Sequence, residues 1–207
     1  MPYATIESVD GKGRGVARIQ GKVTFIEGAI TGEVVSYNLG KKKPGYNLAK
    51  ISELIHESSA RVSPRCESFG TCGGCSMQHM DLETQVSTKQ RVLEDSLMRI
   101  GNVRPDVVFP AIYGDGWRYR RRARLSARYV RKKGLVLVGF REKGKSYVAE
   151  ISDCHVIPTA ASRILKPLGQ LIGELSIKEK IPQIEMADSD SGSTLVIRVM
   201  DVLSRFD

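Results

Sequence analysis

Short stretches of alternating apolar and polar residues, separated by glycine-rich turns, fill the first part of the chain. This pattern predicts five strands within residues 3–55. The predicted strands are Ala4–Val9, Val16–Ile19, Val23–Ile26, Glu33–Tyr37 and Asn47–Leu54. Five short strands at this spacing indicate a small OB-like barrel, although an SH3-like barrel would give nearly the same pattern.

The periodicity changes to that of a helix after residue 80. Apolar residues recur at helical spacing through Asp81–Ile100, from Leu82 to Leu97, in an otherwise polar stretch. Asp81 is a suitable N-cap, and Gly101 can end the helix.

Strand patterns return beyond Pro110, with one further helix. The predicted elements are a hairpin of Trp117–Val130 and Leu135–Arg141, a strand at Ser146–Ser152, a helix at Thr159–Leu175 that Pro167 should kink or delay, and strands at Ile181–Met186 and Thr194–Leu203. We expect an antiparallel sheet with helices to one side. The fold class is therefore α+β, mostly β, with a barrel at 1–58, an irregular loop at 59–80 and an incomplete α+β domain at 81–207.

Composition adds the expected surroundings of the molecule. The chain is 41% hydrophobic and 27% charged, as is usual for a soluble globular protein. It contains no apolar run of 18 residues and no secretory signal at its start, so we expect a cytoplasmic protein with no membrane partner. We also expect the protein to be a monomer.

Cysteine is scarce and clustered in the irregular loop. The spacing is C-x5-C-x2-C, from Cys66 through Cys72 to Cys75, followed after 78 residues by Cys154. Gly73 and Gly74 remove Cβ bulk between two of the thiols, so the backbone can curl around a metal. In a reducing compartment such a group more often binds metal than forms disulfides.

Several interpretations of these cysteines differ in the metal. A four-thiolate site suits an iron–sulfur cluster or structural zinc, and His79 or His155 could replace one thiolate around zinc. Four unrelated core cysteines are a further alternative. A fourth thiolate leaves no open iron, which argues against radical chemistry on S-adenosylmethionine.

Basic residues concentrate between residues 118 and 133. The nine are Arg118, Arg120, Arg121, Arg122, Arg124, Arg128, Arg131, Lys132 and Lys133, with no acidic residue among them, and their charge equals the +9 of the whole chain. In a strand, the even-numbered arginines would form a row about 7 Å apart on one face, close to the spacing of phosphates. We therefore expect RNA binding by Arg118, Arg120, Arg122, Arg124, Arg128, Lys132 and Lys133.

Two alternatives qualify this interpretation. The row could be a solvated face balanced by acids on neighbouring strands, although the adjacent hairpin strand offers only Glu142. Lys41, Lys42 and Lys43, on the barrel, could extend an RNA-binding surface or form a plain solvated turn.

The cysteine loop also carries a resemblance to a known family. Residues 63–66 read SPRC, and residues 72–79 read CGGCSMQH. These segments resemble the cluster loop of bacterial RNA (uracil-5-)-methyltransferases, in particular the 23S ribosomal RNA type with an iron–sulfur cluster. Residues 10–18 (DGKGRGVAR) resemble that family's TRAM domain, and residues 119–125 (YRRRARL) resemble its central domain.

The resemblance implies a function for the whole chain. It implies a [4Fe–4S] cluster on Cys66, Cys72, Cys75 and Cys154, and 23S rRNA as the partner. In the family, a further domain binds S-adenosylmethionine and supplies the catalytic cysteine and base; neither matches this chain, so we expect recognition of RNA without catalysis. The alternative functions are a stand-alone RNA- or ribosome-binding module with an iron–sulfur or zinc site, and a zinc-dependent nucleic-acid adaptor unrelated to methylation.

Overall fold

The structure is a computed structural model that describes residues 2–207. Its contacts divide the chain into two units. The first runs to Pro64 and resumes at Ser76–Tyr113, and the second consists of Arg65–Cys75 and Gly114–Asp207. The irregular region expected at 59–80 is therefore shared between the units. No helix among the described residues is long and apolar enough to cross a membrane.

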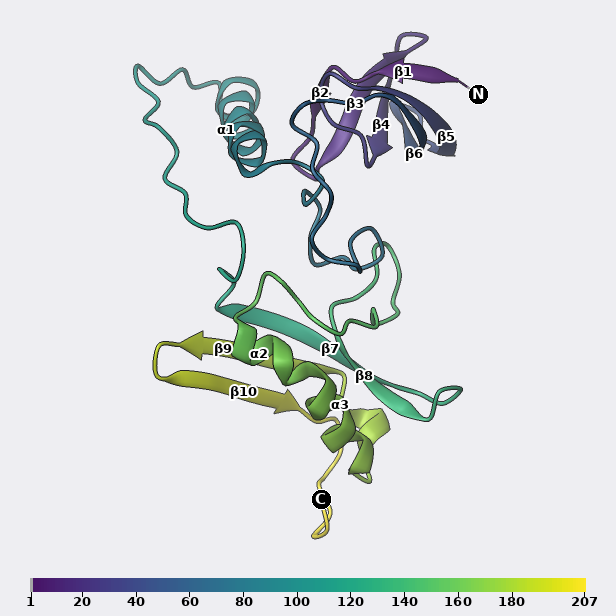
Figure 1. The fold of residues 1–207 in the computed structure, drawn as a ribbon, viewed down its shortest axis with the longest axis vertical. Coiled ribbons are helices and arrows are strands. Elements are labelled where there is room, and N and C mark those ends of the chain that lie inside the picture. Colours follow the sequence, from purple (N-terminus) through teal and green to yellow (C-terminus); the bar gives the residue numbers. More distant parts are fainter. Residues whose placement is uncertain (1) are drawn as a thin grey trace. The chain divides into compact units, whose positions relative to one another are not determined.

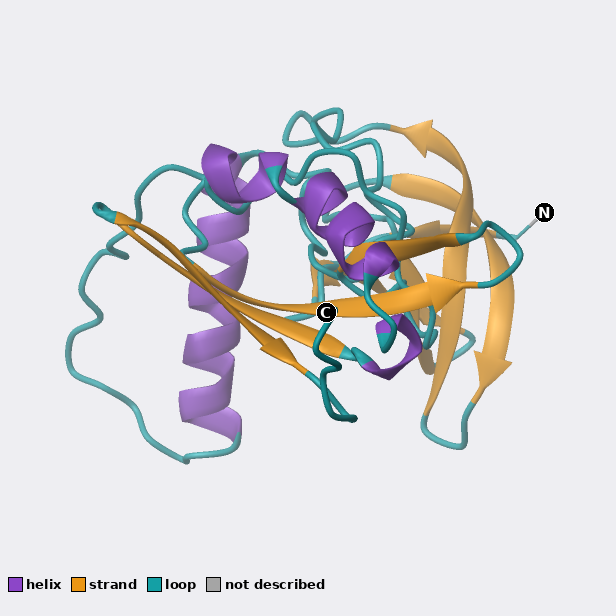
Figure 2. Ribbon diagram, turned by 90° about the horizontal axis from the view of Figure 1, so that it is seen from below, coloured by secondary structure: helices purple, strands orange, loops and turns teal. Residues whose placement is uncertain are grey.

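The first unit contains a curled sheet of six strands (Figures 1 and 2). They are β1 (Tyr3–Thr5), β2 (Ser8–Val9), β3 (Arg14–Ile19), β4 (Lys22–Glu27), β5 (Val34–Lys42) and β6 (Tyr46–His56), in the order β1-β5-β6-β4-β3-β2. The first predicted strand is thus broken into β1 and β2, which pair with β5 and β3 respectively. Because one short segment bonds both edges, the sheet curls round as expected of an OB-like barrel.

Small and branched apolar residues fill this barrel. Ile6, Ile26, Ala29 and Val35 are almost fully buried inside it. A Cβ added to Gly15 would lie only 2.9 Å from both the Ala29 and Ile6 side chains, so β3 needs glycine where it passes these two residues.

A helix follows the barrel strands in the same unit. It is α1 (Leu82–Arg99), and the Thr84 N–H donates to the Asp81 carboxylate at 2.7 Å, which confirms Asp81 as the N-cap. The sequence pattern placed this helix in the same domain as the later strands, whereas its contacts place it with the barrel. None of its residues is fully buried.

The second unit is an antiparallel sheet covered by helices. It contains β7 (Arg122–Val130), β8 (Leu135–Gly139), α2 (Thr159–Arg163), α3 (Leu165–Glu174), the 3-10 turn η1 (Lys178–Lys180), β9 (Gln183–Ser189) and β10 (Gly192–Arg198). The strand order is β10-β9-β7-β8. Both helices pack on one side of the sheet, where Leu125, Val138, Leu168 and Ile184 lie in one core (Figure 1). The two sheets with few helices confirm the predicted α+β class.

Three predicted elements of this unit change in the structure. The strand expected from Trp117 begins only at Arg122. The strand expected at Ser146–Ser152 is reduced to one bridge, between Arg141 and Val148. The helix expected at Thr159–Leu175 divides at Ile164, and Pro167 falls in the first turn of α3, where its missing N–H costs no helical hydrogen bond.

Candidate metal centre and nucleic-acid interface

Three of the four cysteines lie on one tightly turned loop of the second unit. The Phe69 N–H donates to the Cys66 carbonyl at 3.0 Å, and the Cys72 N–H donates to the Ser68 carbonyl at 2.8 Å. Gly70 has a φ of +90°, a conformation that glycine adopts without steric cost. These bonds turn the chain back on itself between Cys66 and Cys72.

The two glycines between Cys72 and Cys75 fit closely against the segment that follows β8. The Gly73 N–H donates to the Arg141 carbonyl at 2.8 Å, and a Cβ on Gly73 would lie 2.9 Å from that oxygen. A Cβ on Gly74 would lie 3.1 Å from the Phe140 ring. Close packing therefore favours glycine at both positions, most strictly at Gly73, where the obstacle is backbone; neither residue has the positive φ that a glycine turn would use.

The backbone also favours negative charge on one of the thiols. The Gly74 N–H donates to the Cys72 Sγ at 3.4 Å. A backbone donor directed at sulfur stabilises a thiolate, as is common around metal-bound cysteine.

Cys154 is buried and held from several directions. Its N–H donates to the Ser162 hydroxyl at 2.7 Å, and that hydroxyl donates in turn to the Asp153 carboxylate. The Arg118 guanidinium donates to the Cys154 carbonyl at 2.6 Å and to the Ile157 carbonyl at 3.2 Å. These contacts fix the position of the fourth cysteine without using its sulfur.

The four thiols lie within electrostatic reach of one another. Burial raises the pKa of the Cys66 thiol, and the charges of Cys154 and Cys75 raise it further. Hydrogen bonds from the Ser68 and Phe69 N–H groups lower this pKa and so oppose the rise. Burial also raises the pKa of the Cys72 thiol, with the other three cysteines adding to the effect and the Gly74 N–H opposing it. Four thiolates gathered here would repel one another unless a cation compensated them.

The chemistry of this donor set suits a metal centre. All four cysteines are present as thiols rather than disulfides, and all belong to the second unit. Within residues 2–207, no three His, Cys, Asp or Glu side chains are gathered at the distances needed for a single metal ion.

Arg118 and Arg120 depart from the predicted row of arginines. Arg118 has a φ of +56°, and its N–H donates to the His155 carbonyl rather than to a neighbouring strand. The Arg120 guanidinium donates to the Gly74 carbonyl at 3.3 Å and lies 5.5 Å from the centre of the Phe140 ring. Both side chains are half-buried and support the cysteine site, because the strand that would have turned them outward starts after them.

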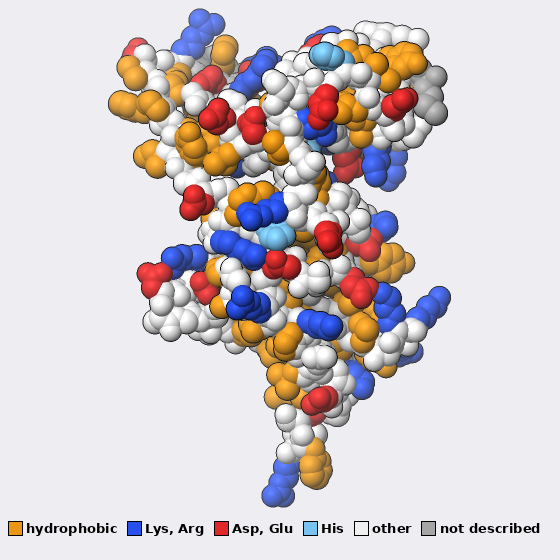
Figure 3. Space-filling model, in the orientation of Figure 1, with side chains coloured by type: hydrophobic (Ala, Val, Ile, Leu, Met, Phe, Trp, Pro, Cys, Tyr) orange, Lys and Arg blue, Asp and Glu red, His pale blue; other side chains and the backbone are white. Residues whose placement is uncertain are grey.

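The remaining arginines follow the predicted alternation. Arg122, Arg124 and Arg128 are exposed, whereas Leu125 and Ala127 are buried in the core. Strand β9 supplies an acid that the sequence pattern did not place beside them, since Glu185 lies 3.8 Å from Arg124. On the face that Figure 3 shows, Lys and Arg side chains are interspersed with Asp and Glu.

The other predicted RNA-binding lysines lie in turns. Lys132 and Lys133 are exposed between β7 and β8, and Lys133 forms an ion pair with Glu150. Lys41 and Lys42 end β5, Lys43 begins the turn to β6, and all three are exposed.

An aromatic group on the outer side of the barrel was not predicted from the sequence. The Phe25 and Tyr46 rings meet edge to face, 5.5 Å apart, and the Arg14 guanidinium lies 4.3 Å from the centre of the Phe25 ring. The alternation within β4 contained the signal, because Phe25 lies between the buried Thr24 and Ile26 and so points outward.

Comparison with known proteins shows which proteins have a sequence similar to that of this chain. No protein-family model matches the chain. The 23S rRNA (uracil(1939)-C(5))-methyltransferase RlmD of Nitrosospira multiformis is 52% identical over 98% of the chain, and that of Aromatoleum aromaticum is 51% identical over 96%. The chain is a relative of the 23S rRNA (uracil-C5)-methyltransferases. The resemblance inferred from the cysteine loop is thereby confirmed.

The match covers only part of these relatives. The chain spans 46% of the length of each of these two enzymes, and 48% of the RlmD of Azoarcus sp.. Among solved structures, a tRNA (uracil-54, C5)-methyltransferase of Pyrococcus abyssi, in complex with S-adenosyl-L-homocysteine, has a similar fold. The TM-score is 0.66 at 18% identity, and the match covers 98% of this chain and 47% of the other.

Proposed function

We propose that this chain is the RNA-recognition part of an S-adenosylmethionine-dependent methyltransferase that modifies C5 of a uridine in 23S rRNA in the cytoplasm. The observation that carries the proposal is the identity of about half to relatives named for this activity, over nearly all of the chain. The P. abyssi protein of similar fold was solved with S-adenosyl-L-homocysteine, the product left by a methyl donor of this class.

RNA binding is assigned to exposed cations on both units. On the second unit, the exposed arginines Arg122, Arg124 and Arg128 alternate with core residues, so that they can meet successive phosphates. On the barrel, Lys41, Lys42 and Lys43 lie on the β5–β6 hairpin, in the position of an OB-fold loop that commonly contacts oligonucleotides. The outward Arg14–Phe25–Tyr46 group offers stacking surface for unpaired bases.

The iron–sulfur cluster is assigned to Cys66, Cys72, Cys75 and Cys154. Its support is that the four thiols reach one another electrostatically within one unit, in a loop with glycines at its closest approaches. When bound, a cluster supplies positive iron that compensates the thiolates and links the loop to the Cys154 segment. With all four cysteines used in this way, we assign no catalytic nucleophile to the chain.

The test of this proposal measures metal and RNA on the same full-length chain. Anaerobically purified protein should contain iron and acid-labile sulfide, and it should bind an rRNA fragment with an affinity that falls as salt increases. Zinc without sulfide would contradict the cluster. Binding that is independent of salt and no stronger than that of a neutral protein would contradict the RNA assignment.

A further inference from the structure

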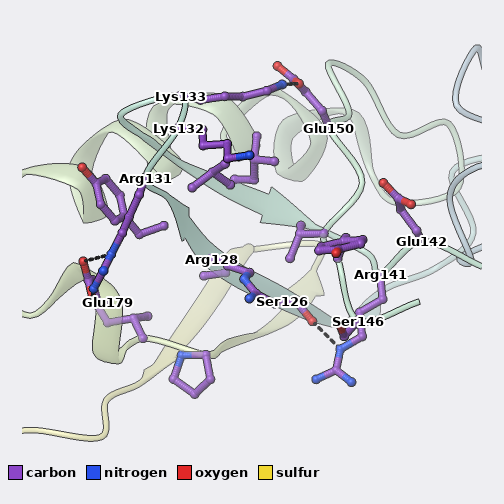
Figure 4. A pocket seen from close by; sticks show the side chains of 18 residues that line it. Ser126, Arg128, Arg131, Lys132, Lys133, Arg141, Glu142, Ser146, Glu150 and Glu179 are labelled. Atoms are coloured by element: carbon purple, nitrogen blue, oxygen red, sulfur yellow. Dashed lines mark hydrogen bonds and ion pairs between the residues drawn. The ribbon is translucent and has the colours of Figure 1, made fainter. Parts of the chain in front are cut away.

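A groove lies along the exposed side of β7 in the second unit. Its volume is about 780 Å³, and its walls are the β7–β8 turn, the segment after β8 and η1 (Figure 4). Ser126 and Arg128 line it from β7, and Arg141 and Tyr147 line it from the segment after β8. The volume lies within the range of pockets that hold small organic ligands.

The cations of the groove outnumber its acids. Arg131 is paired with Glu179 at 2.7 Å, and Lys133 is paired with Glu150. The third acid in the lining, Glu142, forms an ion pair with Lys145 at 2.8 Å, and Lys145 does not line the groove.

Three lining cations are left over from this pairing. Among residues 2–207, Arg128, Lys132 and Arg141 have no acidic group within ion-pair distance. Arg141 donates instead to the Ser126 hydroxyl at 3.4 Å (Figure 4). Guanidinium groups that lack a carboxylate partner favour an anion, and a phosphate in the groove that both residues line can accept hydrogen bonds from such groups.

An aromatic ring stands beside these cations. Tyr147 is 58% exposed, and the Arg128 guanidinium lies 5.9 Å from the centre of its ring. Its backbone is nevertheless fixed, because its carbonyl accepts from the Glu142 N–H at 2.9 Å and the next residue, Val148, is buried. An exposed ring on a fixed backbone at the wall of a basic groove can stack with a base.

We propose that this groove binds one unpaired nucleotide of an RNA strand, with its phosphate on Arg128 and Arg141 and its base stacked on Tyr147. The inference rests on the proposed function and deepens it by assigning a site for a single-stranded segment. Bases within a duplex are already stacked on their neighbours, so Tyr147 can reach only a base that has left the helix.

The experiment measures binding of the full chain to short labelled RNAs by fluorescence anisotropy. The RNA probes are an unstructured single strand and a duplex of equal charge. The protein variants are Tyr147→Leu, Tyr147→Phe and the double variant Arg128→Gln/Arg141→Gln. Arg163→Gln is the control for loss of a charge outside the groove, since Arg163 is exposed on α2 and does not line the groove.

Each substitution has a distinct expected result. Tyr147→Leu should weaken single-strand binding about fivefold or more and duplex binding less than about twofold, whereas Tyr147→Phe should retain affinity. The double variant should weaken the single strand and reduce the salt slope by about 0.7, the value for one phosphate. Arg163→Gln should leave both affinities unchanged.

Other results would overturn the site and separate its failure from that of the proposed function. Equal losses for single strand and duplex with Tyr147→Leu, or competition by polyglutamate as strong as by RNA, would exclude a nucleotide site. Unchanged affinity in all groove variants, with losses on reversing Arg122 and Arg124, would reject the groove and retain RNA binding. Failure of both sets would reject RNA binding on this unit, and circular dichroism excludes unfolding as the cause of any loss.

Discussion

Two halves of one basic segment behave in opposite ways. Arg118 and Arg120 turn toward backbone carbonyls around the cysteine site, whereas Arg122, Arg124 and Arg128 stand exposed on β7. The residues are of one type and, apart from Ser126 at one position, alternate at the same interval in the sequence. The difference lies in the backbone, since Arg118 has a φ of +56° and the strand begins only at Arg122.

The comparison separates an arginine that stabilises the fold from one that is available to a ligand. A guanidinium with five donors can satisfy several carbonyls at once, as Arg118 does for Cys154 and Ile157. The exposed Arg124 has only an ion pair with Glu185 on a neighbouring strand, and such exposed pairs contribute little stability. The two halves should therefore respond differently to substitution.

The largest expected effect concerns the cysteine site, which Arg118 and Arg120 support. We expect Cys154→Ser to lose most bound iron and to unfold about 10 °C lower than the wild type, because cluster binding contributes free energy only to the folded state. Iron and sulfide analysis with thermal unfolding followed by circular dichroism would measure both changes.

The same substitution in iron-free protein is its control. Serine is close in size to cysteine, and burying its hydroxyl is the main added cost, so the two apo-proteins should differ by much less than the decrease expected with the cluster bound. An equally large loss in the apo-protein would show that Cys154 acts through packing and hydrogen bonding rather than through a metal.

The next largest expected effect concerns the exposed arginines of β7. Reversal of Arg122, Arg124 and Arg128 to Glu should weaken RNA binding about a hundredfold at about 0.1 M salt, since each phosphate contact on a single strand contributes about 0.7 to the salt slope. Stability should change little. Titration at several salt concentrations would show the affinity and a slope reduced by about 2.

A matched reversal tests whether position matters as well as charge. Arg163, Lys166 and Lys180 are exposed outside β7, and their reversal to Glu alters the net charge by the same amount. It should weaken binding far less. Equal losses in the two triple variants would mean that RNA responds to net charge alone.

Arg118 provides the direct test of the comparison. Arg118→Gln should lower the free energy of unfolding by about 2 kcal/mol, because the variant lacks the hydrogen bonds from a charged donor to the Cys154 and Ile157 carbonyls. RNA affinity should change less than about twofold. Urea unfolding monitored by circular dichroism would measure the decrease in stability.

Arg121 is the control within the same segment. Arg121 forms an ion pair with Asp190 at 2.7 Å, but its side chain is 58% exposed, so Arg121→Gln should change the stability far less than Arg118→Gln does. If Arg118→Gln and Arg121→Gln were equally stable, the inward contacts of Arg118 would make no measurable contribution to stability.

Local pattern was sufficient for much of this fold. The helix at Leu82–Arg99 with its Asp81 cap followed from periodicity and capping chemistry, and the barrel strands followed from alternation between glycine turns. The pairing of Cys154 with a loop 78 residues earlier came from residue type and family resemblance, and the structure brings them into one unit.

Tertiary partners decided what the pattern did not. Arg118 points inward because carbonyls about 36 residues later in the chain accept its donors, and no local periodicity encodes them. Glu185 was missed because β9 pairs with β7 across a long connection. Ser146–Ser152 has the composition of a strand, but it has a single bridge instead of a full partner.

The smallest expected effect tests how much a single exposed lysine on the barrel contributes to RNA binding. Lys41 and Lys42 are neighbouring exposed residues at the end of β5, where the register with β6 shifts between Leu39 and Lys42, so simple alternation along the strand does not fix the directions of their side chains. Removal of one phosphate-binding lysine should weaken binding about fivefold at about 0.1 M salt and lower the salt slope by about 0.7. An RNA strand that runs along one face of the hairpin should make one of Lys41→Gln and Lys42→Gln show this decrease and the other almost none, measured by anisotropy with the same single strand. Equal small decreases in both variants would mean that the hairpin attracts RNA diffusely, as a solvated turn does, whereas unequal decreases would identify the face of the barrel along which the strand runs.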